Sequence, residues 1–433
     1  MYDAKCEAMG REDLAQLQIE RLQLTLNRVY RNVAFYRHTF DAAGVAFEKI
    51  RAIEDFKDIP FTTREDLARS YPYDMFAVPL KDVVRIHSAR GASRRMLVVG
   101  YTKNDLRHWT DCAARVLTAA GVSDQDVVQI AFHYDLFSGG FGFHQGAERL
   151  GASVIPASGA MSLEKQVTIM RDYKTTVLVG TPSLAYNLGA MLDAFGVQPQ
   201  ALHLRVGLFG AEPWSEEMRA RIEERLHLTA IDSYGLAAVM GPGVAGECAC
   251  KDGLHVNEDH FIVEVVDPRT LRPLPPGEEG ELVFTTITRE AFPVIRFRTG
   301  DLSALVPGTC ACGRTFARIR RIGGRIDGRI FFGGRNVFLS QLDRIMREVL
   351  GTPPHFQVVV DRKDGVDGME IRTEVSADIP SIDELKTLDR LRAAIVRQIE
   401  IEAGVQARVT FVEPKTLARS ESGEVARVVD TRE

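Results

Sequence analysis

The sequence predicts an α/β protein with a large N-terminal domain and a small α+β C-terminal domain. Short apolar runs that end in Gly, Pro or Ser alternate with helical stretches in the first half of the chain. After Asp259 the pattern changes to alternating apolar residues with Pro/Gly turns, which is typical of antiparallel strands. A Gly/Arg-rich segment, RIGGRIDGRIFFGGRNVF, then precedes a compact final stretch. A chain of 433 residues is also too long for one hydrophobic core, which favours two or three domains, by default a large one and a smaller one.

In chain order, the first predicted element is a long amphipathic helix over 14–33, where apolar residues recur at helical spacing. The next apolar runs are predicted strands of an α/β sheet: DVVQIAF, ASVIPAS, TTVLVGTP and LRVGLFGAEP. Ligands of such sheets bind beyond the carboxyl ends of the strands. The candidate site segments are therefore 180–183, 210–214 and 233–235. HFIVEVVDP and ELVFTTIT then predict antiparallel strands.

The glycine- and arginine-rich segment predicts a hinge at Asp327, so that the domains span 1–326 and 327–433. Beyond it, LSQLDRIMREVL and LKTLDRLRAAIVRQIEIEA are predicted helices, and HFQVVV, MEIRTEV and ARVTFV are predicted strands. These elements would form a compact α+β domain.

Composition limits the classes of function. The chain is 45% hydrophobic and 26% charged, with a net charge of −5, which predicts a soluble protein without a nucleic-acid or membrane surface. The start of the chain contains acidic residues and no apolar run of signal-peptide length, which predicts a cytoplasmic location. A homodimer is a fair expectation for a soluble enzyme.

Six cysteines are too few for a disulfide scaffold, and Cys6 and Cys112 stand alone. Four soft ligands form two pairs about sixty residues apart: Cys248 with His255, and Cys310 with Cys312. They predict a closed tetrahedral zinc site with a structural role, because a full set of protein ligands leaves no open position for water. Two alternatives stay open, namely that Cys250 replaces Cys248 as a ligand and that all of these are reduced thiols without metal.

Motifs between about Leu14 and Asp430 read YTKNDLRHW, GTPS, LFGAEPWSEEMR, GPGVAGEC, PVIRFRTGDL and GGRNVFLSQ. Together they resemble the phenylacetate-CoA ligase family of the acyl-adenylate-forming (ANL) superfamily. The resemblance implies the ANL fold, with a mobile C-terminal domain after the hinge and an active site in the cleft between the domains. Relatives often carry the same Cys/His/Cys/Cys set, which strengthens the zinc prediction. The family converts a carboxylate and ATP into an acyl-AMP and then passes the acyl group to CoA.

Three positions at which the family handles ATP depart from its pattern. The phosphate loop, approximately SSGTTGKP in relatives, keeps only its first glycine among Arg90, Gly91, Ala92, Ser93 and Arg94. Ala237 and Ala238 stand where relatives have a threonine beside the α-phosphate and a glutamate that holds Mg²⁺. Glu424 replaces the lysine of a C-terminal Gly-Lys pair, which would oppose phosphate chemistry.

Other positions match the family. The nucleotide and CoA residues implied by the resemblance are Gly210, Ala211, Glu212, Tyr234, Gly235 and Asp301, the last of which would hold the ribose hydroxyls. The implied aromatic-acid pocket consists of Tyr134, Phe137, Gly139, Gly140 and Phe141. His133 and His144 lie in the same region and are candidates for a catalytic base.

The selective loss of ATP residues favours an enzyme that does not adenylate. The prediction is an acyltransferase that moves an aromatic acyl group from acyl-CoA to an acyl carrier protein in biosynthetic priming, without ATP or Mg²⁺. The first alternative is an ATP-dependent aryl-acid CoA ligase of the phenylacetate, benzoate or anthranilate kind. The second is an inactive partner subunit that binds CoA or a nucleotide.

Overall fold

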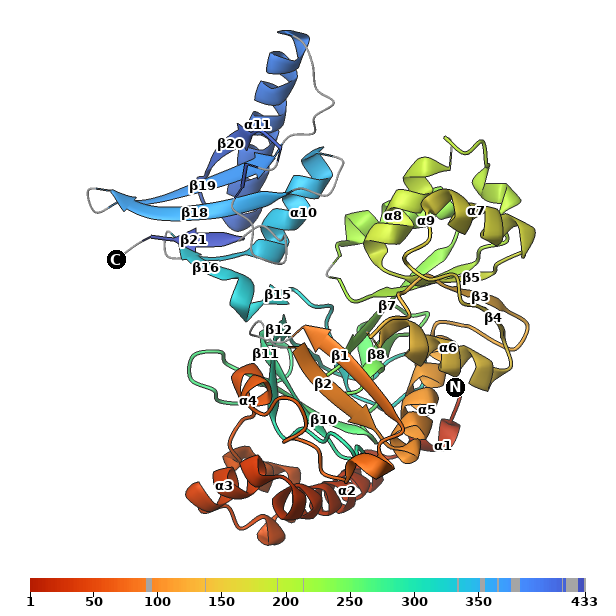
Figure 1. Cartoon of the computed structure of the whole chain (residues 1–433), viewed down its shortest axis with the longest axis vertical. Coiled ribbons are helices and arrows are strands. Elements are labelled where there is room, and N and C mark those ends of the chain that lie inside the picture. The colour runs from red at the N-terminus through yellow and green to blue at the C-terminus, as the bar shows by residue number, and fades with distance from the viewer. Residues whose placement is uncertain are drawn as a thin grey trace. The chain divides into compact units, whose positions relative to one another are not determined.

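A computed structural model of the chain (Figure 1) describes residues 1–90, 96–136, 138–192, 194–212, 214–332, 335–350, 355–363, 366–374, 382–414, 416–417 and 427–431. The chain divides into two compact units, Met1–Gly323 and Gly324–Glu433. The predicted domain boundary after residue 326 therefore falls three residues beyond the observed division after residue 323. The role of Asp327 as a hinge stays a prediction.

The first unit begins with helices that pack against its antiparallel region. These are α1 (Ala4–Glu7), α2 (Arg11–Asn32), α3 (Ala34–Ala42) and, after two 3₁₀ turns, α4 (Arg64–Arg69). Helix α2 confirms the predicted amphipathic helix, because its buried residues Leu22, Leu26 and Val29 follow helical spacing. The short 3₁₀ turns of the chain are η1 (Phe47–Lys49), η2 (Ile53–Asp58), η3 (Leu80–Asp82), η4 (Pro199–Ala201) and η5 (Ile326–Gly328).

A nine-stranded sheet forms the centre of the first unit, in the order β13-β14-β9-β8-β7-β6-β5-β3-β4. Its parallel half consists of β3 (Val127–Ile130), β4 (Ser153–Ile155), β5 (Val177–Gly180), β6 (Val206–Gly210) and β7 (Thr229–Leu236). Its antiparallel half consists of β8 (Gly241–Glu247), β9 (Leu254–Val256), β13 (Leu305–Val306) and β14 (Arg318–Ile319). The four strands predicted from the early apolar runs are confirmed as β3 to β6.

Helices cover both faces of the parallel half (Figure 1). Helices α5 (Lys103–Ala119) and α6 (Gly139–Leu150) cover one face, and α7 (Leu163–Asp172), α8 (Pro182–Met191) and α9 (Glu216–Leu226) cover the other. Val177 and Val179 pack with the first pair of helices, whereas Leu178 between them packs with the second group. Burial on both faces explains why these strands read as continuous apolar runs.

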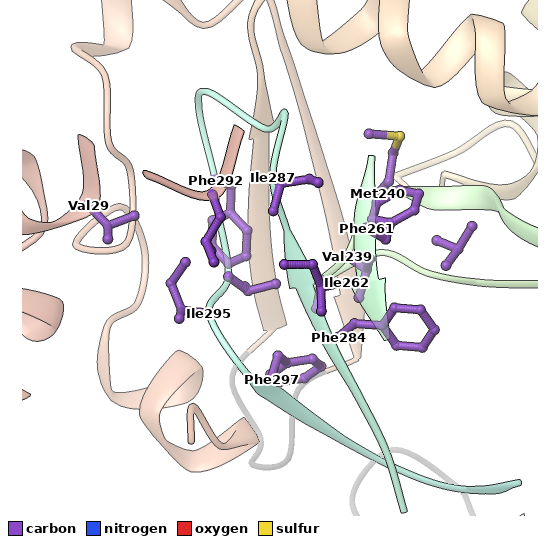
Figure 2. Close-up of a cluster of buried hydrophobic side chains, with 14 of the residues drawn as sticks. Val29, Val239, Met240, Phe261, Ile262, Phe284, Ile287, Phe292, Ile295 and Phe297 are labelled. Atoms are coloured by element: carbon purple, nitrogen blue, oxygen red, sulfur yellow. The ribbon is translucent and has the colours of Figure 1, made fainter. Parts of the chain in front are cut away.

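The antiparallel region pairs β10 (Phe261–Val266), β11 (Gly280–Thr286) and β12 (Phe297–Ser303), and a hairpin of β1 (Arg85–Arg90) and β2 (Met96–Tyr101) adds to this unit. Figure 2 shows the core behind it, where Phe261, Phe284 and Phe297 gather with Val239 and Met240 from the turn after β7. This core holds the end of β7 in place, and the end of β7 carries part of the candidate site.

The second unit has its own sheet and its own core. Its strands are β15 (Gly324–Arg325), β16 (Arg329–Phe332), β17 (Arg335–Phe338), β18 (Phe356–Lys363), β19 (Val366–Glu374), β20 (Arg408–Val412) and β21 (Val428–Asp430), and its helices are α10 (Leu339–Leu350) and α11 (Ile382–Ala403). The main sheet has the order β20-β19-β18-β21, and Ile345, Val358, Ile371 and Ile399 are buried against it. The predicted fold class, a large α/β domain followed by a small α+β domain, is confirmed. Among the described residues, no helix is both long and apolar enough to cross a membrane.

Candidate functional site

The loops that follow the parallel strands meet at one edge of the large sheet. The backbone N–H of Ser183, after β5, donates to the carboxylate of Glu212, after β6, at 3.3 Å. The segments 180–183 and 210–214 are therefore neighbours, as their positions after consecutive strands predict. Ala211 has a φ of +68°, in the left-handed region that non-glycine residues seldom adopt. This turn places the Glu212 side chain toward the neighbouring loop.

Two glycines allow a close approach of backbones at the same edge. A Cβ on Gly210 would lie 2.3 Å from the carbonyl oxygen of Ser233, and a Cβ on Gly235 would lie 2.0 Å from that of Gly241. The Ser233 hydroxyl donates to the Phe209 carbonyl oxygen at 3.0 Å. Side chains at either glycine would push strands apart, so these positions of the predicted nucleotide site have a structural reason to be glycine.

Tyr234 and Asp301 form the best-defined part of the predicted nucleotide site. The Tyr234 hydroxyl donates to Asp301 Oδ2 at 2.7 Å, and both side chains are buried. The two residues come from β7 and β12, sixty-seven positions apart in the chain. The Tyr234 ring also stacks on Phe284, with ring centroids 6.0 Å apart. The arrangement holds a carboxylate in a fixed position beside the loops described above.

A network of charged residues fixes the end of the 210–214 loop, and the sequence did not reveal it. Arg321 donates to Asp232 Oδ2 at 2.9 Å and to the Trp214 carbonyl oxygen at 2.7 Å. Its guanidinium carbon lies 4.4 Å from the centroid of the Trp214 ring, and that of Arg219 lies 5.1 Å from it. Burial raises the pKa of Asp232 to about 6, although Arg321 acts in the opposite direction. In the sequence, Arg321 is the first residue of the segment RIGGRIDGRIFFGGRNVF, which was interpreted as a hinge region.

The predicted aromatic-acid pocket is brought together in part. The Tyr134 ring meets the Phe141 ring edge to face at 5.3 Å, and the Tyr134 hydroxyl lies 3.0 Å from His144 Nδ1. A Cβ on Gly140 would lie 2.7 Å from the carbonyl oxygen of His133. The neighbouring Gly139 begins α6, the His133 side chain is exposed, and Phe137 lies outside the described residues.

The candidate bases differ in their surroundings. His144 is bonded on both ring nitrogens, because its Nε2 lies 3.1 Å from Glu148 Oε1 while Nδ1 faces Tyr134. A doubly bonded imidazole is positioned to orient Tyr134 rather than to accept a proton from a substrate. The assignment of either His133 or His144 as a catalytic base stays a prediction.

His87, on β1, belongs to the same aromatic group and was missed from the sequence. Its ring lies 5.3 Å from Phe141 and 5.8 Å from Trp109, between ring centroids. Its Nδ1 lies 3.2 Å from the Leu136 carbonyl oxygen, and its side chain is buried. A single histidine before a loop carries no recognisable pattern, so only the tertiary structure identifies it.

The positions that depart from the family pattern are only partly described. Ala237 and Ala238 follow β7 in a turn where the N–H groups of Val239 and Met240 donate to the Leu236 carbonyl oxygen at 3.0 and 2.9 Å. The Ala238 methyl is buried in the apolar core. Arg90 ends β1, but its side chain, the positions Gly91, Ala92, Ser93 and Arg94, and Glu424 lie outside the described residues.

The four predicted metal ligands converge on one point. The ligand atoms of Cys248, His255, Cys310 and Cys312 all lie within 4.8 Å of one another. The Cys248 and Cys310 sulfurs are 3.7 Å apart, and Cys312 Sγ is 3.4 Å from His255 Nε2. These spacings fit a tetrahedral ion with bonds of about 2.0–2.3 Å. Cys250 is exposed and is not part of the group, so the geometry favours Cys248 over it.

The N-terminal segment packs beside this cluster. The Arg314 guanidinium donates to the Glu7 carboxylate at 2.5 Å, and the N–H of Thr315 donates to the Glu7 carbonyl oxygen at 2.9 Å. The Met1 methyl carbon lies 3.4 Å from the position that a Cβ on Gly313 would occupy. The first residues of the chain therefore lie against the turn that carries Cys312.

Comparison with known families and proteins agrees with this geometry. Residues 139–288 match the family model for AMP-binding enzymes, and residues 334–432 match that for the C-terminal domain of AMP-binding enzymes. A phenylacetate-coenzyme A ligase of Escherichia coli K12 is 44% identical over 98% of this chain and 97% of its own length. The protein of the same name from Thermus thermophilus is 42% identical over 100% of both chains.

Solved structures of an acyl-CoA ligase share the fold. A 2-hydroxyisobutyryl-CoA ligase in the postadenylation state, in complex with R3-HIB-AMP, has a TM-score of 0.83 and 26% identity, and the match covers 98% of this chain and 91% of that one. The same ligase in complex with 2-HIB-AMP and CoA has a TM-score of 0.74 and 26% identity, with coverage of 99% and 92%.

These findings overturn the predicted acyltransferase that does not adenylate. Relatives that match along the entire chain are named as CoA ligases, and the related solved ligase holds an acyl-AMP. The expectation that ATP and Mg²⁺ are not used, and that an acyl carrier protein is the acceptor, loses its basis with it. The error came from reading missing side chains as a missing reaction, although backbone amides and arginines can also hold phosphates.

Identity at this level along the full chain, together with both family models and the shared fold, assigns the chain to a family. The protein belongs to the phenylacetate-CoA ligase family of the adenylate-forming superfamily.

Proposed function

We propose that the protein is an ATP-dependent ligase that joins an aromatic carboxylic acid of the phenylacetate class to CoA. The observation that carries the proposal is 44% identity to a phenylacetate-coenzyme A ligase over 98% of the chain. The geometry supports it, because the fixed Asp301 carboxylate lies at the edge of the sheet where the three candidate loops end. Acyl-CoA and CoA are then the product and a substrate of the reaction.

Each described part has a task in this reaction. The Asp301 carboxylate, oriented by Tyr234, would accept hydrogen bonds from the ribose hydroxyls of the nucleotide. Tyr134 and Phe141 would flank the aromatic ring of the acid and so place its carboxylate for attack on the α-phosphate. Mg²⁺ would neutralise the phosphates of ATP. The buried Ala238 methyl group offers no oxygen atom and cannot be one of its ligands.

A direct assay tests this proposal. Incubation with phenylacetate or a ring-substituted analogue, ATP, Mg²⁺ and CoA should release AMP and form the acyl-CoA in equal amounts. We expect Asp301→Asn to raise the KM for ATP by about tenfold, since a neutral amide accepts a weaker hydrogen bond than a carboxylate. The matched control is Asp41→Asn, which should leave the KM for ATP unchanged. Asp41 is far from Asp301 in the sequence, and its carboxylate accepts an exposed hydrogen bond from the Tyr30 hydroxyl.

Two outcomes would count against the ligase. If the chain releases no AMP with any aryl acid, the inactive CoA- or nucleotide-binding subunit becomes the better description. If AMP forms but Asp301→Asn and Asp41→Asn have the same KM for ATP, then Asp301 does not hold the nucleotide.

We also propose that the cluster of Cys248, His255, Cys310 and Cys312 binds a structural Zn²⁺. Four protein ligands close the coordination shell, so the ion would join the β8–β9 turn to the segment after β13 without taking part in the reaction. We expect one zinc per chain by elemental analysis. Cys312→Ser should lose the metal and lower the melting temperature, whereas Cys250→Ser, at an exposed cysteine outside the cluster, should retain both. Retention of zinc by Cys312→Ser would contradict the site.

The cytoplasmic location and the homodimer stay predictions from the sequence.

A further inference from the structure

Three polar side chains surround the Phe141 ring on the side of the β1 strand and the β3–α6 loop. The Tyr134 and His87 rings each lie 5.3 Å from the Phe141 ring, and the Arg85 guanidinium carbon lies 5.4 Å from it. Arg85 and His87 are two positions apart on β1, so they lie on the same face of that strand. Together with Phe141 they form one composite wall of the predicted aromatic-acid pocket.

His87 supplies a hydrogen-bond acceptor without a partner. Its side chain is only 3% exposed, and its Nδ1 must carry the proton because the Leu136 carbonyl oxygen, 3.2 Å away, can only accept. Burial, Arg85 and Arg289 lower its pKa, which keeps the ring neutral. The Nε2 lone pair is then free, and Nε2 has no hydrogen-bond partner among the described residues. A buried polar atom without a protein partner calls for another group to complete it, and a ligand beside Phe141 would supply one.

Arg85 supplies a hydrogen-bond donor beside that acceptor. Its half-buried guanidinium donates to the neutral Gln145 amide oxygen at 3.2 Å, and no ion pair involves it within the part of the chain that is described. A guanidinium has five N–H groups, so others remain to bind a ligand. One face of β1 therefore carries a donor side chain and an acceptor side chain two positions apart, both beside the Phe141 ring.

Tyr134 faces the same ring, and its hydroxyl lies 3.0 Å from His144 Nδ1, while the Glu148 carboxylate lies 3.1 Å from His144 Nε2. In the tautomer that donates from Nε2 to Glu148, Nδ1 accepts the Tyr134 proton. The Tyr134 oxygen can then only accept from a substrate. A substituent that offers lone pairs without a proton would meet repulsion there. His144 and Glu148 act through Tyr134 as positioning residues.

We propose that the acid is a hydroxyaryl acid, whose ring hydroxyl donates to His87 Nε2 and accepts from Arg85. This inference rests on the proposed ligase function and names the class of acid. A plain phenyl ring would leave Nε2 unpaired, and a methoxy group could accept from Arg85 but has no proton for His87. A hydroxyl is the substituent that satisfies both groups.

The test is the ratio of kcat/KM, measured by AMP release, for the 2-, 3- and 4-hydroxyphenylacetates against phenylacetate and the methoxy analogues. We expect the best hydroxy isomer to be favoured over phenylacetate by about tenfold or more. His87→Asn keeps a donor near the Nδ1 position but deletes Nε2, and it should abolish the preference. Tyr134→Phe should improve the relative rate of the methoxy acids. Tyr30→Phe removes an exposed tyrosine hydroxyl on α2 and is the matched control.

The outcomes separate this inference from the ligase proposal. Equal kcat/KM for hydroxy and plain acids, or a His87→Asn variant that melts normally and keeps the preference, overturns the inference while the ligase stands. If no acid releases AMP, the ligase proposal fails. In that case, the affinity of the same acids for the wild-type chain and for His87→Asn can be measured by calorimetry. The inference is overturned if the two proteins bind hydroxyphenylacetate with equal affinity.

Discussion

Asp232 is a buried carboxylate whose pKa burial raises from 3.8 to about 6, against the attraction of Arg321. Between these two values the folded protein binds more protons at this site than the unfolded chain. The contribution of the site to the free energy of unfolding must therefore fall as the pH rises from about 4 to about 6, by on the order of 1 kcal/mol per pKa unit.

We expect Asp232→Asn to remove this dependence, since an amide does not titrate. Urea unfolding at several pH values between 4 and 7 should show the stability of the wild-type protein falling relative to that of the variant as the pH rises. Asp172→Asn, at an exposed pair with Arg171, should leave the slope unchanged. Parallel curves for the wild-type protein and Asp232→Asn would contradict the assignment.

Single residues of a candidate site were predictable from the sequence when several residues of the same chemical kind occurred together in a recognisable pattern. The four proposed zinc ligands stood out because soft ligands in two such pairs are rare, and the structure brings all four together. His87 and Arg321 could not be found in this way. Their significance depends on partners far along the chain, such as Phe141 and Trp214, that only folding brings near.

At the scale of elements, the distance between neighbouring backbones decides whether a side chain can be accommodated at the end of a strand. Gly210 and Gly180 both end parallel strands, but a Cβ on Gly210 would lie 2.3 Å from a carbonyl oxygen, whereas the nearest atom for Gly180 is a methyl group at 3.5 Å. We expect Gly210→Ala to cost about 1–3 kcal/mol of folding stability through overpacking and to raise the KM for ATP.

Gly180→Ala is the matched control for stability, and it should change the midpoint of urea unfolding very little, because its methyl group would make an ordinary van der Waals contact. If both variants unfold at the same denaturant concentration, the close approach at Gly210 does not contribute to the stability difference.

Elements with a strong period were predictable from the sequence, and others were not. Helices α2 and α10 and strands β3 to β6 follow the predicted ranges within a few residues, because their apolar residues recur at one regular spacing. Strand β8 reads GPGVAGE, and small residues gave no sign that it is buried between β7 and β9. Its glycines are explained by packing against α5, where a Cβ on Gly243 would lie 3.0 Å from the backbone of Ala113.

At the scale of the whole molecule, the two units have separate apolar cores. We therefore expect two thermal transitions by scanning calorimetry. Ile371→Ala, at a fully buried position of the second unit, should lower the free energy of unfolding of that unit by about 2–5 kcal/mol. The midpoint temperature of one of the two transitions should fall as a result. Leu208→Ala, equally buried in the large sheet, should lower the other. A single transition that both variants shift alike would show that the units unfold together.

The function of the whole chain was harder to predict than its fold. The fold follows from patterns repeated over hundreds of residues, whereas the acyltransferase prediction depended on a few altered side chains such as Ala238 and Glu424. A changed side chain removes one interaction but does not show which reaction the remaining site performs. Similarity along the full chain to named ligases is the stronger observation.

The packing of the first residues against the turn that carries Cys312 has a consequence for protein production. Met1 lies against Gly313, so a polyhistidine affinity tag fused at that end would bring extra imidazoles beside the cysteine cluster. Such a tag would compete with the cluster for the proposed zinc ion, and nickel that the tag retains from purification would add to the metal found by elemental analysis. A tag at the other end of the chain, or one removed by protease before the measurement, leaves the metal count to the four native ligands.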